Sequence, residues 1–312
     1  MHKIKFIPTI ALAVILSSCS LFGSGKAPKF DNEGDEVDKY SDFYDRAMQA
    51  INRSEIMDSE ARFTDRTIKT SFYESRVSSV KRDRKEISKS EYTMNVKGES
   101  QYDVDNLVGK LTEESKQTSK GNDQEGNGSY TYTAKGEGYY QFEKPNGSKA
   151  LIYANTKTQQ YSIRESVSSS RKQENIFDDL IRSELNNLVN QFYNYIPGSS
   201  NDAKDYLFYI KDDSLFTISL TKESSSSNEN YDVVTKTKLK VQFDVTDKKQ
   251  SLKVSSEIQN EYTYNSSENG HKKYDVQTEN NINYREYTVS AKSINVSAID
   301  TSDYYLSNSY SY

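Results

Sequence analysis

The sequence predicts an α+β fold in which a long, curved antiparallel β-sheet, a half-barrel-like meander, packs against two main amphipathic helices. Two patterns predict these elements. Apolar and polar residues alternate over much of the chain, as they do in strands that bury one face. Two other stretches repeat apolar residues every three or four positions, as helices do. With 34% hydrophobic residues, 25 Tyr and 12 Phe in 312 residues, the chain has enough apolar area for a core.

The first 18 residues have the pattern of a secretory signal peptide. A basic start with two lysines is followed by an apolar run over residues 6–16, and Ser17 and Ser18 then precede Cys19, the single cysteine. The apolar run is too short to cross about 30 Å of hydrocarbon as a helix. We therefore expect residues 1–18 to be removed rather than to anchor the protein.

Leu16, Ser17, Ser18 and Cys19 resemble the lipobox of bacterial lipoproteins, in which an aliphatic residue and two small residues precede a cysteine. The resemblance implies that diacylglycerol is attached to Cys19 and that cleavage makes Cys19 the mature N-terminus. Acyl chains contribute about 0.8 kcal/mol per buried CH₂ and would hold the protein on a membrane. The expected location is the bacterial cell envelope, outside the cytoplasm, on the cell membrane or on an outer membrane. The alternative is a lone cysteine behind an ordinary signal peptide.

Composition excludes several classes of function. A net charge of -5 disfavours nucleic-acid binding, and one cysteine forbids an internal disulfide or a cysteine-rich metal site. His271 is the only histidine after the signal peptide, and it is expected in an exposed turn. The paired carboxylates at 113–114 and 212–213 are expected in turns or solvated loops. We predict no cofactor, no metal and no enzymatic activity.

Residues 19–37 are predicted to form a lipidated flexible tether, because small and polar residues cannot bury enough apolar area to become ordered. Asp31, Glu33 and Asp35 alternate as at the start of a calcium loop. However, the glycine comes two positions too early and Asp42 stands where the loop needs a glutamate. This pattern favours a solvated linker over a calcium site.

The remaining residues, 38–312, are predicted to form one β-rich domain that begins with a helix over about 38–53. The apolar stripe of this helix consists of Tyr40, Phe43, Tyr44, Ala47, Met48 and Ile51. Alternating residues predict strands over about 60–165. Within this range, Thr112 to Gly128 contains no apolar residue and is predicted to be a long mobile hairpin loop.

One basic cluster lies among these strands. It consists of Arg76, Lys81, Arg82, Arg84, Lys85 and Lys89. Asp83 and Glu86 interrupt it, which favours a charged hairpin tip or strand edge over contact with anionic head groups or a cell-wall polyanion.

A second helix is predicted over about 175–196, from Asn175 as its cap to Pro197 and Gly198 at its end. Its apolar stripe consists of Ile176, Phe177, Leu180, Ile181, Leu185, Leu188, Val189, Phe192 and Ile196. Strands follow over about 205–298. Their apolar residues change phase near Arg285 and Glu286, which predicts a β-bulge there.

The order of helix, strands, helix and strands behind a lipobox resembles the half-barrel lipoproteins of the LolA, LppX and LprG group. The resemblance implies a curved sheet that wraps around helices and encloses an apolar cavity, but it carries over no functional residue. The side chains that would face a ligand are Phe177, Ile181, Leu185, Leu188 and Phe192 of the helix and Leu239, Val241 and Phe243 of the sheet. One departure is a predicted inner face rich in Tyr and Thr, which is compatible with a filled core.

We therefore expect a lipid-anchored extracytoplasmic lipoprotein that binds an apolar or amphipathic ligand without catalysis. Its expected partners are the membrane, through Cys19, and a lipid or other hydrophobic ligand. Exposed Tyr, Ser and Asn residues motivate one alternative, an adhesion or envelope-interaction protein without a small-molecule ligand. An envelope hydrolase is a further alternative that the sequence supports poorly.

Overall fold

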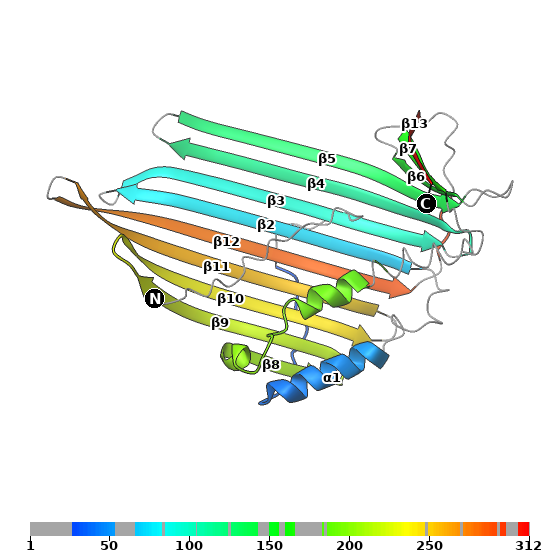
Figure 1. Ribbon diagram of the computed structural model, residues 1–312, viewed down its shortest axis with the longest axis horizontal. Coiled ribbons are helices and arrows are strands. Elements are labelled where there is room, and N and C mark those ends of the chain that lie inside the picture. Colours follow the sequence, from blue (N-terminus) through cyan, green and yellow to red (C-terminus); the bar gives the residue numbers. More distant parts are fainter. Residues whose placement is uncertain are drawn as a thin grey trace.

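A single open β-sheet forms most of the protein (Figure 1). The structure, a computed structural model, describes residues 27–53, 66–82, 85–103, 105–123, 126–142, 150–155, 160–165, 183, 186–246, 249–268, 271–291, 294–297 and 305–311. The strands are β1 (Asp35–Glu36), β2 (Arg66–Arg82), β3 (Lys85–Asp103), β4 (Val108–Asp123), β5 (Gly126–Phe142), β6 (Ala150–Asn155), β7 (Gln160–Glu165), β8 (Tyr206–Lys211), β9 (Leu215–Ser227), β10 (Tyr231–Thr246), β11 (Lys249–Glu268), β12 (His271–Ala291) and β13 (Tyr305–Ser311).

Two antiparallel meanders make up the sheet. In the strand order β1-β8-β9-β10-β11-β12-β2-β3-β4-β5-β6-β7-β13, the meander β8–β12 joins the meander β2–β7 where β12 pairs with β2. Every described pair of neighbouring strands is antiparallel except β13 with β7. The α+β class and the antiparallel sheet are therefore confirmed. The alternating pattern did not predict β1 or β13, the short strands at the two ends of this order.

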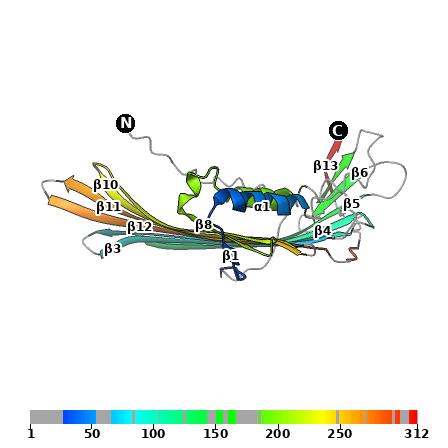
Figure 2. The ribbon, with the colours of Figure 1, turned by 90° about the horizontal axis from the view of Figure 1, so that it is seen from below.

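Helices cover less of the sheet than the sequence predicts. Helix α1 (Tyr40–Arg53) begins and ends close to the predicted bounds. The second helix includes the described residues 183 and 186–193, and residues 194–196 form a turn rather than its last part. Both helices lie on the same face, near one end of the long strands, and the gently bent sheet does not close around them (Figure 2).

The core lies between these helices and the sheet. Phe43 and Ala47 of α1 and Leu188 and Phe192 of the second helix are fully buried. The ring of Phe43 lies 5.9 Å from that of Phe216 on β9, edge to face. Most of the described core lies at this end of the sheet. Its large aromatic side chains bury much apolar area and so contribute strongly to the stability of the fold.

The strands continue far beyond the helices. The 20 residues of β11 span about 66 Å, several times the length of an average strand. In this bare half of the sheet no described helix covers either face (Figure 2). Cross-strand polar pairs hold the strands there, such as Ser78 with Ser90 and Ser79 with Thr278, each pair 2.8 Å apart.

The predicted loop from Thr112 to Gly128 is wrong. Its residues form the paired ends of β4 and β5, and only 124–125 lie outside the described residues. In this register Ser115 stands opposite Ala134, and Gln117 opposite Tyr132. A strand without apolar residues is stable here because no layer packs on it, so neither face needs to be apolar.

The predicted β-bulge near Arg285 and Glu286 is also wrong. The pairing of β12 with both β11 and β2 runs through these residues without a register shift. Ile282 and Val289 therefore lie on opposite faces. The apolar phase changes because helices cover only the end of β12 that carries Val289, which is buried.

Candidate functional site

The structure tests only part of the predicted site. The lipobox residues Leu16, Ser17, Ser18 and Cys19 lie outside the described residues. So do Phe177, Ile181 and Leu185, three of the predicted ligand-facing residues.

The other predicted ligand-facing residues belong to the core. Leu188, Phe192, Val241 and Phe243 are 0% exposed, and Leu239 is partly buried against them. The rings of Phe192 and Phe243 stack with their centroids 4.4 Å apart. These side chains therefore contact one another across the space between helix and sheet.

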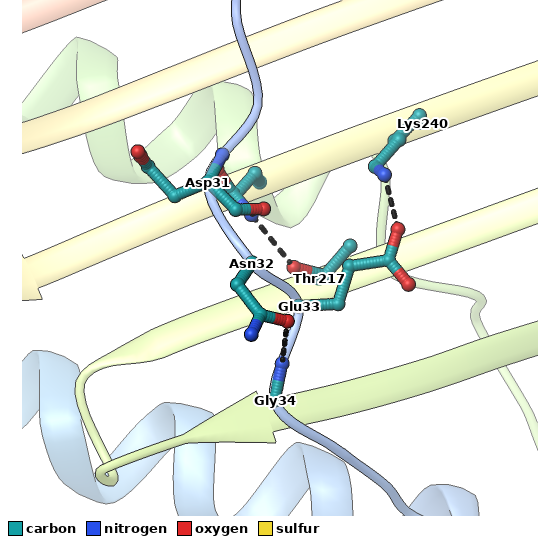
Figure 3. A network of polar contacts seen from close by, with 7 residues as sticks. Asp31, Asn32, Glu33, Gly34, Thr217 and Lys240 are labelled. Atoms are coloured by element: carbon teal, nitrogen blue, oxygen red, sulfur yellow. Dashed lines mark hydrogen bonds and ion pairs between the residues drawn. The ribbon is translucent and has the colours of Figure 1, made fainter.

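The segment from Phe30 to Glu36, here called the strap, crosses the opposite face of the sheet (Figure 3). The side-chain amide of Gln242, which is buried, accepts a hydrogen bond from the Asp31 N–H at 2.8 Å and donates one to the Asp31 carbonyl at 3.1 Å. It also donates to the Thr217 hydroxyl at 3.2 Å. The side-chain amide of Gln242 thus makes the same pair of hydrogen bonds to the Asp31 backbone that a neighbouring strand would make.

Carboxylates of the strap form ion pairs with lysines of the sheet. Asp31 lies 2.7 Å from the Lys253 ammonium, and Glu33 pairs with Lys240 (Figure 3). Two of the three acidic residues that suggested a calcium loop, Asp31 and Glu33, are therefore paired with lysines. The part of the predicted tether from Phe30 onward is ordered on the sheet.

The strap then turns around the edge of the sheet. Gly34 has a φ of +89°, and a Cβ there would collide with the carbonyl oxygen of Ile210 on β8. After β1, the Val37 N–H donates to the Phe208 carbonyl at 2.8 Å, and α1 begins on the other face. The N-terminal segment therefore connects the two faces around β8.

The two faces of the bare half differ in charge. On the face crossed by the strap, here called the strap face, lysines and glutamates pair across neighbouring strands. These pairs are Lys135–Glu114, Lys236–Glu223 and Lys238–Glu257, with separations of 3.0 to 3.4 Å. Such cross-strand ladders stabilise a solvated sheet.

The helix-bearing face, here called the helix face, carries few charges and many hydroxyl, amide and phenol groups. Register places Asn281, Arg76, Tyr92, Ser119 and Tyr130 side by side across β12, β2, β3, β4 and β5. We call these five residues the tyrosine row. Since Tyr92 and Tyr130 stand two strands apart, their backbones are separated by about 9.6 Å.

A hollow of about 450 Å³ lies at one end of this row. It is lined by Arg76, Val77, Ser78, Ser90, Tyr92, Glu279 and Asn281. The guanidinium of Arg76 lies 5.9 Å from the centre of the Tyr92 ring and 2.5 Å from the Glu74 carboxylate. Burial and the nearby Glu74 raise the pKa of Tyr92 against the opposing effect of Arg76, so its phenol is neutral at physiological pH.

Tyr130 and Tyr132 on β5 extend this surface. They are 55% and 48% exposed, which is high for tyrosines within a sheet. Sequence reasoning missed the site because it assigned these residues to strands without knowing which of their faces stays uncovered.

The basic cluster does not form one surface. Arg82 and Lys85 stand at the tip of the β2–β3 hairpin, as predicted, whereas Arg76 lies in the tyrosine row. Lys89 pairs with Glu91 at 2.5 Å. Arg84 lies outside the described residues, and the other members of the cluster divide between the two faces and the hairpin tip.

The paired carboxylates do not form acid–base pairs. Glu113 and Glu114 lie in β4 rather than in a loop and, as neighbours in a strand, point to opposite faces. Burial raises the pKa of Glu113. Asp212 and Asp213 do lie in a turn, and Asp213 pairs with Arg46 at 2.5 Å. His271 begins β12 rather than lying in a turn.

A second hollow, of about 510 Å³, lies beside the start of α1. It is lined by Glu36, Val37, Asp38, Lys39, Asp42, Asp45 and Arg46. Within the described ranges, no three His, Cys, Asp or Glu side chains come close enough together to hold a metal ion. None of the helices described is both long enough and apolar enough to cross a membrane.

No protein-family model matches the chain, and no curated protein matches it either. The candidate site therefore has to be interpreted from its own chemistry.

Proposed function

We propose that the protein is a lipid-anchored, noncatalytic envelope lipoprotein that binds an extended, uncharged polysaccharide along the tyrosine row. The observation that carries this proposal is the contrast between the faces: the strap face pairs its charges, whereas the helix face exposes phenol, amide and hydroxyl groups.

The groups of the tyrosine row match the chemistry of a sugar chain. The faces of sugar rings carry C–H groups that pack on aromatic rings, and their hydroxyls exchange hydrogen bonds with amides and hydroxyls. Tyr92 and Tyr130 offer the rings, and Asn281, Ser119 and Ser90 offer the polar groups. The two-strand spacing of the rings suits every second sugar of an extended β-linked chain.

The charge of the site disfavours other polymers. Arg76 is already paired with Glu74, so the row offers no free positive charge to attract an anionic polymer. An apolar ligand would leave the hydroxyls and amides of the hollow without partners, which is costly on binding.

Binding of chitohexaose and cellohexaose, two uncharged β-linked oligosaccharides, tests this proposal. The full-length protein should be held in a detergent without a sugar head group, and binding measured by calorimetry. We expect Tyr92→Ala and Tyr130→Ala each to weaken binding about tenfold, which corresponds to about 1.4 kcal/mol.

The matched control for these variants is Tyr305→Ala, since Tyr305 is 75% exposed but lies on β13, away from the row. Its binding should equal that of the wild type. Equal losses in all three variants, no binding of either sugar, or tighter binding of an oligogalacturonate would each contradict the proposal.

The anchor is tested separately by labelling cells with a fatty-acid analogue. We expect the label on the wild-type chain and none on Cys19→Ala, which should leave the membrane fraction because no acyl chain holds it. The control is Ser20→Ala, which keeps the cysteine and should stay labelled. An unlabelled wild-type chain would contradict lipidation whatever the result with sugars.

Lipid-carrier-like binding is a second candidate, because both helices lie on one face of the sheet as the half-barrel resemblance implies. The ligand would have to separate Phe192 from Phe243, which now stack. Native mass spectrometry of the purified protein should then show a co-purified lipid, and a clean protein mass would contradict this candidate.

A further inference from the structure

One edge of the bare half lacks a neighbouring strand among the described residues. Strand β5 pairs with β4 along its whole length, but β6 pairs with β5 only from Gly138 to Phe142. We call residues 128–134 the β5 edge. Residues 128–133 are all exposed, and no other described strand pairs with this part of β5 on the side away from β4.

The β5 edge lacks the features by which strands at sheet edges avoid pairing with other chains. Such edges usually carry charges, prolines or bulges. Residues 128–134, Gly-Ser-Tyr-Thr-Tyr-Thr-Ala, contain no charge and no proline, and their pairing with β4 has no bulge.

The opposite edge of the bare half is different. Among the described residues, β9 pairs with β8 only as far as Leu220, so residues 221–227 have a neighbouring strand on one side only. There Lys222 pairs with Asp205, and Glu223 with Lys236, and the remaining positions are mostly serines. This charged, serine-rich edge disfavours pairing, whereas the β5 edge permits it.

We propose that two copies of the chain join along the β5 edge, in an antiparallel pair of β5 strands that continues the sheet from one copy into the other. A two-fold axis perpendicular to the sheet at Thr131 sets Thr131 opposite Thr131 of the second copy. It also sets Tyr130 opposite Tyr132, and Ser129 opposite Thr133, in both directions.

This register is chemically self-complementary. Tyr–Tyr and Thr–Thr pairs are favourable across antiparallel strands, and no charged residues of like sign meet within residues 128–134. An isologous pair uses the same edge of both copies, so the assembly closes at two. Free backbone N–H and C=O groups of both edges become paired, which gives the interface its main-chain hydrogen bonds.

The pairing continues the helix face across both copies. The tyrosine row of one copy would end at Tyr130, beside Tyr132 of the second copy, so one extended ligand could contact both. The dimer itself does not depend on what the row binds.

A cysteine at the two-fold axis tests the pairing in intact cells. In Thr131→Cys the two Cα atoms would lie about 4.5–5.5 Å apart, within the range that a disulfide spans. We expect most of the full-length variant to run as a disulfide-linked dimer on a non-reducing gel. Ser225→Cys, on the exposed β9 edge, is the matched control and should remain monomeric.

The wild-type chain is the second control, since an unacylated Cys19 would crosslink by itself. A monomeric Thr131→Cys, equal dimer in Thr131→Cys and Ser225→Cys, or a crosslink to a different protein would each overturn the proposal. These results do not change the sugar-binding or fatty-acid measurements, so the dimer can be disproved without disproving the proposed function, and the reverse.

A charge at the axis tests the same interface without a crosslink. Thr131→Lys sets two ammonium groups opposite each other on an exposed edge, where the substitution costs the monomer little. By native mass spectrometry we expect a dimer for the wild type and at least tenfold weaker dimerisation for Thr131→Lys. A wild-type monomer, or a dimer that Thr131→Lys leaves unchanged, would contradict the two-fold pair.

Discussion

At the scale of single residues, Asp103 at the end of β3 shows how one buried carboxylate connects distant parts of the chain. It is 1% exposed and accepts hydrogen bonds from the Asn106 N–H at 3.0 Å, the Asn106 side-chain amide at 2.8 Å and the Val296 N–H at 3.1 Å. Burial alone would raise the pKa of Asp103, but these hydrogen bonds together outweigh it and lower the pKa. The charged form is therefore the one that the fold stabilises.

A lowered pKa in the folded state fixes the sign of the pH dependence. The stabilisation is present above the ordinary carboxyl pKa of about 3.9 and is lost as the pH falls through the lower folded value. We expect Asp103→Asn to reduce the free energy of unfolding by about 1–3 kcal/mol at pH 7.

This loss should be smaller near pH 3, below the ordinary carboxyl pKa of about 3.9, because the carboxyl of the unfolded chain is then largely protonated and folding in the charged form is less favourable. Urea denaturation at both pH values measures the effect. Asp232→Asn, at an exposed position of β10, is the control and should change stability little at either pH. An equal loss for Asp103→Asn at pH 7 and pH 3 would contradict the assigned role.

At the scale of elements, the strap is the feature that sequence patterns missed. Its composition predicts a tether, and its residues have no apolar period. Its order comes from partners more than 200 residues away, above all Gln242 on β10. Local composition cannot predict such contacts, because it shows the polar groups of the strap but not the distant residues that bind them.

The strap makes a prediction about proteolysis. In Gln242→Ala the backbone of Asp31 loses both hydrogen bonds to the amide, each worth about 0.5–1.5 kcal/mol. We expect trypsin to cleave after the exposed Lys29 about tenfold faster or more, because the strap leaves the sheet more often.

The matched control is Gln259→Ala, an exposed glutamine on the strap face of β11 that contacts Glu257 instead of the strap. It should be cleaved at the wild-type rate. If Gln242→Ala is cleaved no faster than this control, the strap is not held by the amide.

At the scale of the whole molecule, the sheet has a covered half and a bare half, and the two should differ in local stability. Opening a strand in the covered half exposes core residues such as Val241 and Phe243, whereas opening it in the bare half exposes little apolar area. Strand β10 passes through both halves and provides an internal comparison.

We expect backbone amides near Val241 and Phe243 to exchange with solvent at least about tenfold more slowly than those near Val233 and Thr235. Hydrogen exchange followed by mass spectrometry or NMR measures this gradient along one strand. Uniform protection along β10 would show instead that both halves open as one cooperative unit.

The sequence by itself determined the elements that have a strong local period. The stripe from Tyr40 to Ile51 specified α1 within two residues, and the alternation through Val241 and Phe243 specified a strand whose apolar face is buried. It also determined the α+β class, because both periods occur in one chain.

Tertiary structure alone decided which faces are covered. The polar run from Thr112 to Gly128 can pair as strands because the helices stop partway along the sheet. For the same reason the apolar residues of β12 change from the face of Ile282 to that of Val289. The alternation of apolar and polar residues along a strand reflects burial only where a second layer, here the helices, packs on the sheet. The tyrosine row, the strap and the β5 edge all depend on where that layer ends, and this is a property of long-range pairing that no local pattern contains.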